Sequence, residues 1–212
     1  AYLATGRGFS ITPLRGLYTQ EDYYDRVKRQ GTATVRFPLV KGGWWERLID
    51  RPHRFGKQKA RFAPGESYAG VWWAAAAKEQ LRTATEVWIV EGIFDAIALL
   101  QHGTCAVAAM SSNAYPELSL KELRDARPND LPTLVWALDN EPSARNYTLK
   151  HVRRAEKLGF RCKAAQIEQV GEKKTDWNDL HLRAQAAEDG DSQWADDLEL
   201  ALHNGALLLA RT

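Results

Sequence analysis

Three groups of acidic residues each follow a predicted strand, and together they could bind a divalent cation. They are Glu91 and Asp95 after segment 86–90, Asp139 and Glu141 after segment 133–138, and Asp176 and Asp179 after segment 160–167 and a polar loop. Because the carboxyl ends of parallel strands meet at one edge of a sheet, these side chains are expected to lie close together. Clustered carboxylates repel one another, and a hard cation such as Mg²⁺, which prefers oxygen ligands, removes that repulsion. Two such ions about 4 Å apart could hold the attacking and leaving oxygens of a phosphoryl transfer.

The elements that must position these acids alternate between apolar strands and helices. Strands are predicted at 86–90, 105–109, 133–138 and 160–167, and helices at 95–102, 119–126, 144–158, 179–187 and 193–203. Ser119, with Glu122 three residues later, predicts a capping box at one helix start, and Gly159 predicts a helix end. This alternation predicts an α/β domain, a mostly parallel sheet with helices on both faces.

The first part of the chain differs in charge and in pattern. Residues 1–84 contain 15 Lys and Arg against 7 Asp and Glu, a net charge of +8, whereas residues 85–212 carry −6. Strands are predicted at 32–40, 44–49 and 68–73, with short helices at 21–28 and 74–81. We therefore expect a small basic α+β subdomain over residues 1–84. The charge split indicates a polyanion partner for the basic part, unless it reflects chance segregation of solvated faces.

The densest basic stretch supplies candidates for phosphate contact. Arginine offers a planar fork for phosphate and lysine a point charge. The candidates for nucleotide or DNA binding are Arg36, Arg47, Arg51, Lys57, Lys59 and Arg61. Trp45, within this stretch, and Trp177, between two acids, are candidates for stacking on unpaired bases. Trp177 could equally be a packing anchor for its loop.

Composition excludes several classes of protein. With 44% hydrophobic and 26% charged residues, the chain is expected to be soluble and globular rather than disordered. Its apolar runs are too short to span a bilayer, and no secretory signal is visible. Cys105 and Cys162 are too few for a disulfide framework or a tetrahedral zinc site, and we expect reduced core thiols in a cytoplasmic protein. The first residue, Ala1, leads us to expect a fragment of a longer protein.

The acidic motifs resemble those of a known domain. Val90–Leu99 resembles the first signature of the Toprim domain in DnaG-type primases, Asp139-Asn140-Glu141 its D-x-D motif, and Asp176–Leu180 its third acidic motif. The resemblance covers residues 85–185, which leaves 186–212 as a helical extension packed on the Toprim domain. Residues 35–64 loosely resemble the small subdomain that precedes Toprim in those primases.

The resemblance implies the catalytic core of a DNA primase from a phage, plasmid or other mobile element. It would synthesise short RNA primers on single-stranded DNA from ribonucleoside triphosphates, using two Mg²⁺ or Mn²⁺ ions. It would contact a helicase or other replication protein through domains outside this chain. Catalysis would fall to Glu91, Asp139 and Glu141, and metal binding to these three with Asp176 and Asp179.

The motifs also depart from the family pattern, at Ser111, Ala144 and Asn178. These departures leave two alternatives open. One is a Toprim-type nuclease or strand-breaking enzyme, which would use the same metals to cut DNA. The other is a degenerate Toprim module that only binds DNA.

Overall fold

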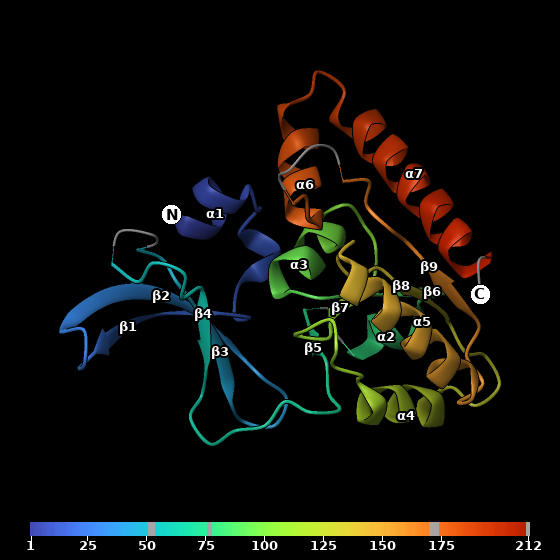
Figure 1. Ribbon diagram of the computed structural model, residues 1–212, viewed down its shortest axis with the longest axis horizontal. Helices are drawn as coiled ribbons and strands as arrows, with labels where there is room; N and C mark the ends of the chain where they lie inside the picture. The colour runs from blue at the N-terminus through green and yellow to red at the C-terminus, as the bar shows by residue number, and fades with distance from the viewer. Residues whose placement is uncertain (51–53, 76–77, 170–173, 211–212) are drawn as a thin grey trace. The chain divides into compact units, whose positions relative to one another are not determined.

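The computed structural model describes residues 1–50, 54–75, 78–169 and 174–210, and it divides into two compact units (Figure 1). The first unit comprises Ala1–Gly6 and Ser10–Tyr68, and the second comprises Arg7–Phe9 and Ala69–Thr212. The division thus lies at residue 68 and not near residue 84, because the segment after Tyr68 joins the sheet of the second unit. The C-terminal residues from 186 onward are also part of the second unit.

The first unit is built on an antiparallel sheet. Its four strands, in spatial order, are β1 (Thr19–Asp25), β2 (Gln30–Pro38), β3 (Trp44–Leu48) and β4 (Ala60–Phe62). A helix, α1 (Tyr2–Arg7), and a short 3-10 turn, η1 (Thr12–Leu14), precede them. Strands β2 and β3 lie where the sequence predicted strands.

The predicted helix at 21–28 is wrong, because most of that segment forms β1. Along β1 exposed and half-buried residues alternate, which is the period of a strand with one face partly covered. The Asp25 carboxylate then accepts hydrogen bonds from the backbone N–H groups of Val27 and Lys28, at 2.9 and 3.0 Å, which turns the chain into β2.

The second unit contains a five-stranded, mostly parallel sheet. Its strands, in spatial order, are β5 (Trp73–Ala74), β7 (Ala106–Ala108), β6 (Glu86–Val90), β8 (Thr133–Trp136) and β9 (Cys162–Ala164). Only β5, at one edge, runs antiparallel to its neighbour. The strand predicted at 68–73 is therefore corrected to this short edge strand.

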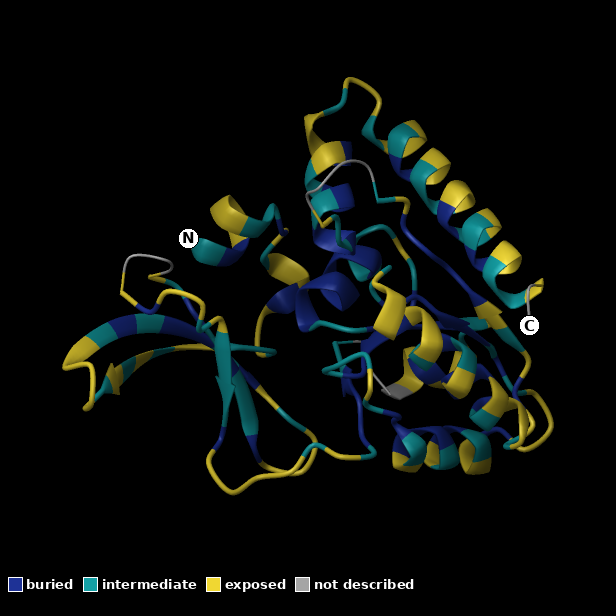
Figure 2. Ribbon diagram, in the orientation of Figure 1, coloured by how far each residue is buried: buried dark blue, intermediate teal, exposed yellow. Residues whose placement is uncertain are grey.

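Helices cover both faces of this sheet, as the α/β pattern predicted (Figure 1). They are α2 (Lys78–Thr83), α3 (Ile93–Gln101), α4 (Glu117–Ala126), α5 (Pro142–Glu156), α6 (Trp177–Ala186) and α7 (Gly190–Ala210). Alternate residues of β6 point to opposite faces: Val87 and Ile89 pack in the core with α4 and α5, whereas the Trp88 ring meets Trp177 of α6 edge-on. Helix α3 is almost entirely buried (Figure 2).

Two further predictions need correction or comment. Ser119 does not cap a helix, because α4 already begins at Glu117; the Ser119 hydroxyl instead accepts a hydrogen bond from the Trp72 N–H at 3.2 Å. Cys105 and Cys162 are free thiols, but only Cys105 is fully buried. Among the described residues, no helix is long and apolar enough to cross a membrane.

Candidate active site

The strand order creates a switch point at which the acidic motifs meet. From β6 the chain passes first to β7 on one side and later to β8 on the other, so the connections diverge at the carboxyl ends of β6 and β8. Ligand sites of open α/β sheets form at such points. Glu91 directly follows β6, Asp139 lies just beyond β8, and Glu141 is the N-cap residue of α5.

The turn into α3 adds Asp95 to this group. Gly92 is the N-cap of this helix, and a Cβ atom at this position would lie 2.8 Å from Asp95 Oδ2, so any larger residue would displace the Asp95 carboxylate. Asp95 is buried, and its Oδ1 accepts a 3.4 Å hydrogen bond from the Asn178 N–H. Asp95 belongs to the first of the three acidic groups in the sequence, but it was not among the predicted metal ligands. The available signal was a glycine followed three residues later by an acid.

Asp176 and Asp179 begin helix α6 through reciprocal hydrogen bonds. Asp176 Oδ1 accepts from the Asp179 N–H at 2.8 Å, and Asp179 Oδ2 accepts from the Asp176 N–H at 3.3 Å. This capping box satisfies two backbone donors that a helix start leaves unpaired. In both Asp176 and Asp179, which are predicted metal ligands, one carboxylate oxygen therefore already accepts a hydrogen bond from the helix backbone.

The carboxylates influence one another's proton affinity. Burial, followed by the negative charge of Asp139, raises the pKa of Glu91 to about 7. Burial and the charges of Asp176, Asp139 and Glu91 raise the pKa of Asp95 well above its usual value. Burial also raises the pKa of Asp176. The carboxyl groups of the three acidic motifs therefore interact electrostatically, and those of Glu91, Asp95 and Asp176 bind a proton more tightly than free carboxyl groups do.

Lys174 partly neutralises this cluster. Its Nζ lies 2.6 Å from Asp139 Oδ2 and 2.9 Å from Glu141 Oε1. Although burial opposes its charge, the hydrogen bonds that Lys174 donates to these two carboxylates raise its pKa overall. The oxygen donors suit a hard divalent cation. Among the described residues, however, no three ligand side chains stand together in a metal-binding arrangement.

A second cation, Arg7, was not predicted. Its Nη1 donates to Asn178 Oδ1 at 2.9 Å, and Asn178 Nδ2 donates back to the Arg7 carbonyl at 3.0 Å. The guanidinium lies 4.5 Å from the centre of the Phe94 ring, and its charge opposes the rise that burial causes in the pKa of Asp176. Asn178, where the family pattern has an acid, thus fixes an arginine beside the cluster. No motif marks a contact between residues so far apart in sequence.

Of the two roles that the sequence left open for Trp177, base stacking and packing, the structure favours packing. Its side chain is buried, and its Nε1–H donates to the Ala137 carbonyl at 2.9 Å. This hydrogen bond joins α6 to the segment that follows β8, and so helps to hold Asp176 and Asp139 near each other.

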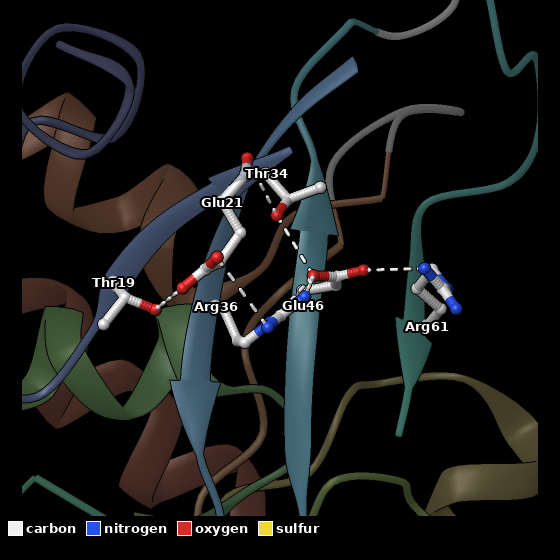
Figure 3. Close-up of polar contacts among 6 residues, drawn as sticks. All are labelled: Thr19, Glu21, Thr34, Arg36, Glu46 and Arg61. Atoms are coloured by element: carbon white, nitrogen blue, oxygen red, sulfur yellow. Dashed lines mark hydrogen bonds and ion pairs between the residues drawn. The ribbon is translucent and has the colours of Figure 1, made fainter. Parts of the chain in front are cut away.

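In the first unit, two of the predicted phosphate-binding residues are bound to a buried glutamate (Figure 3). Glu46 accepts from Arg36 at 2.9 Å, from Arg61 at 3.0 Å and from the Thr34 hydroxyl at 3.1 Å, and its side chain is 0% exposed. The guanidinium of Arg36 also stacks on Trp44, at 4.1 Å from the ring centre. The guanidinium groups of Arg36 and Arg61 therefore both make their contacts with residues of the same sheet.

The other basic candidates remain closer to solvent. Lys57 and Lys59 are exposed, and Arg47 is half-buried. Trp45 is half-buried against Phe37, with ring centres 6.0 Å apart. Arg51 lies outside the described residues.

Comparison with known proteins agrees with this geometry. The sequence model of the Toprim-like family matches residues 88–181, the segment that contains Glu91, Asp139, Glu141 and Asp176. A search of curated proteins found no match.

Several solved structures share the fold. A DNA primase domain from Pseudomonas aeruginosa is 20% identical with a TM-score of 0.54, and the match covers 86% of this chain and 56% of that domain. The RNA polymerase domain of Mycobacterium tuberculosis primase DnaG is 21% identical with a TM-score of 0.54, over 97% and 71%. The primase fragment of the bacteriophage T7 primase-helicase protein is 12% identical with a TM-score of 0.56, over 91% and 72%.

These identities establish the fold alone. The Toprim-like α/β fold and its likeness to the RNA polymerase domains of DnaG-type primases, both expected from the sequence, are confirmed. The chain spans little more than half of the Pseudomonas domain. The Mycobacterium domain was also solved in complex with a double-stranded DNA oligomer with a 6-nucleotide overhang.

Proposed function

We propose that this chain is the catalytic core of a DNA primase, which joins ribonucleotides into a short RNA primer on a single-stranded DNA template. The observation that carries the proposal is the gathering of Glu91, Asp95, Asp139 and Asp176 in one electrostatic cluster at the sheet's switch point. The cluster lies in a fold shared with primase RNA polymerase domains. An acidic cluster at that position is suited to phosphoryl transfer.

The residues would divide the work by position and proton affinity. Asp139, Glu141 and Asp176 offer carboxylate oxygens for Mg²⁺ or Mn²⁺, which when bound would neutralise charge on the triphosphate and on the departing pyrophosphate. Glu91, with a pKa of about 7, can accept a proton from the attacking 3′-hydroxyl at neutral pH. That hydroxyl oxygen forms a bond to the α-phosphorus as the bond to pyrophosphate breaks.

Template and partners are proposed with the same function. The Mycobacterium domain was solved with a double-stranded DNA oligomer that has a 6-nucleotide overhang. That overhang is single-stranded, and it supports single-stranded DNA as the class of template that we propose. The exposed Lys57 and Lys59 are the candidates for contact with the DNA backbone. A helicase partner is proposed because the T7 relative is a fragment of a primase-helicase protein.

The test is primer synthesis on a single-stranded template with all four ribonucleoside triphosphates and Mg²⁺. The variant is Glu91→Gln, which keeps the shape of the side chain but cannot accept the proton. We expect primer synthesis to fall about 100-fold or more, with folding and DNA binding retained. The readout is radiolabelled RNA product resolved on a denaturing gel.

Glu86→Gln is the matched control. Glu86 begins the same strand that Glu91 follows, but at its opposite end, where it pairs with Lys163. This variant should retain wild-type synthesis. If the wild-type chain cuts the template and makes no RNA, the function is that of a nuclease. If Glu91→Gln synthesises primers at the wild-type rate, the assignment of the site is wrong.

A further inference from the structure

Lys174 occupies the position where two of the proposed metal ligands face each other. Its ammonium group bridges Asp139 Oδ2 at 2.6 Å and Glu141 Oε1 at 2.9 Å. Asp139 is mostly buried and Glu141 is exposed, so the lysine joins the inner and outer carboxylates of the D-x-E motif. The Lys174 ammonium thereby supplies positive charge that a divalent metal ion would otherwise provide at this edge of the sheet.

The backbone that presents Lys174 is held in place on its C-terminal side. Gln169 donates through Nε2 to the Thr175 carbonyl at 3.0 Å and accepts through Oε1 from the Thr175 N–H at 2.9 Å. The next residue, Asp176, is the N-cap of α6 and part of its capping box. The main chain that directly follows Lys174 is therefore held by these hydrogen bonds.

Its side chain can leave because solvent reaches it. The Lys174 side chain is 47% exposed, and a lysine ammonium is strongly hydrated on a flexible four-carbon stem. An ammonium and a divalent cation compete for the same carboxylate oxygens, and the doubly charged ion is attracted more strongly.

We propose that Lys174 is an internal counter-ion that keeps Asp139 and Glu141 together before the metal binds and is displaced by the metal. Lys174 is thus a positioning residue that sets metal affinity. The inference rests on the metal dependence of the proposed function, since it concerns the same carboxylates. Once displaced, the ammonium is free to contact the phosphates of a bound nucleotide.

The test measures Mn²⁺ binding by isothermal titration calorimetry and by electron paramagnetic resonance, with no nucleotide present. In Lys174→Met the competing charge is gone, and we expect Mn²⁺ to bind about 10-fold more tightly than in the wild type. The melting temperature of the metal-free variant should fall, because Asp139 and Glu141 are no longer neutralised. Added Mg²⁺ should raise that temperature more in the variant than in the wild type.

Two further variants separate charge from shape and from general effects. Lys174→Arg keeps the positive charge and should bind Mn²⁺ within about 3-fold of the wild type. Lys163→Met removes an equally short ion pair, 2.6 Å to Glu86 Oε1, at the other end of the same sheet, and should leave Mn²⁺ affinity unchanged. If Lys174→Met fails to fold, Lys174→Gln replaces it, with the same expectation.

The outcomes distinguish this inference from the proposed function. Equal or weaker Mn²⁺ binding by Lys174→Met, with clear binding by the wild type, would overturn the counter-ion role and leave a metal-dependent enzyme standing. Binding by neither protein, while primers are still made, would overturn both the counter-ion role and the assignment of the metal ligands. Tighter binding by Lys174→Met alone, with both controls unchanged, supports the inference.

Discussion

At the scale of the residue, buried polar side chains show how each unit specifies its own packing. Glu46 is the clearest case, because its two arginines and one threonine come from neighbouring strands and lock the register of β2, β3 and β4. Removing one partner of such a buried ion pair leaves an uncompensated charge, which costs far more than the pair itself contributes. The ion pairs of Glu46 with Arg36 and Arg61 are therefore better explained by a role in fixing the register of the sheet than by phosphate binding.

His151, buried in α5, predicts an acid-sensitive fold. Its Nε2 lies 3.0 Å from the Ser112 carbonyl, the rings of Tyr115 and Trp136 pack around it, and burial lowers its pKa from 6.5 to about 4. The unfolded chain takes up the proton first as the pH falls. The stability that the neutral form contributes is therefore complete above about pH 6.5 and is lost as the pH falls towards 4.

The variant His151→Gln tests this, because glutamine stays neutral and can still donate to the Ser112 carbonyl. Between pH 7 and pH 4.5 we expect it to lose about 2 kcal/mol less unfolding free energy than the wild type loses. Urea unfolding at the two pH values gives the comparison. His203→Gln, at an exposed position on α7, is the control and should retain the wild-type pH dependence. An unchanged pH dependence in His151→Gln would contradict the prediction.

The sequence pattern indicated where the acidic residues of the site lie, but not which positively charged side chains lie beside them. Glu91 follows β6, Asp139 lies just beyond β8 and Asp176 is the N-cap of α6, so the local pattern alone predicts that they meet at one edge of the sheet. Arg7 comes from the start of the chain, and its contact with Asn178 depends on tertiary packing that no local spacing encodes. The same holds for Arg36, whose contact with Glu46 becomes apparent only once the register of β2 and β3 is known.

At the scale of the element, helix α7 depends on one glycine. A Cβ atom at position 205 would lie 1.9 Å from the Ala164 carbonyl oxygen of β9, so the helix and the strand backbone are in direct contact there. Helix α7 continues to Ala210, well past the predicted end at His203. A glycine inside a helix lowers its intrinsic propensity, and only packing against β9 offsets that loss.

Gly205→Ala should therefore destabilise the protein, although alanine is the better helix former by about 1 kcal/mol. We expect a net loss of about 2 kcal/mol of unfolding free energy, because α7 must move away from β9. The measurement is urea denaturation followed by tryptophan fluorescence. Glu199→Ala, at an exposed position of the same helix, should change stability by less than about 0.5 kcal/mol. Equal stability of the two variants would show that the close contact is absent.

The sequence predicted the strands correctly where both faces of the strand are buried. Strands β6 and β8 read as continuous apolar runs, and both were located correctly. Strand β1 was taken for a helix because its residues are mostly polar, and its pairing with β2 supplies the hydrogen bonds that stabilise it as a strand. Edge strands of two or three residues, such as β5 and β4, have too few residues for any periodicity to appear.

At the scale of the whole molecule, the net charge of +2 conceals two units of opposite character. The first unit carries most of the excess of Lys and Arg, and the acidic cluster belongs to the second. Within the first unit the basic residues differ in whether they are ion-paired or exposed to solvent. Arg36 and Arg61 share an ion pair with the single carboxylate of Glu46, whereas Lys57 and Lys59 are exposed. Only the exposed charges can release counterions when a polyanion binds.

Single-stranded DNA binding should therefore depend on salt through these lysines. For single strands each phosphate contact contributes about 0.7 to the slope of log affinity against log salt concentration. The double variant Lys57→Ala with Lys59→Ala should lower that slope by about 1.4 and weaken binding similarly for all template sequences. Fluorescence anisotropy of a labelled oligonucleotide between about 50 and 200 mM salt measures it. Lys150→Ala, exposed on α5 of the second unit, should leave the slope unchanged. A double variant with the wild-type slope would move the DNA-binding surface away from these lysines, and the charge excess of the first unit would then need another explanation.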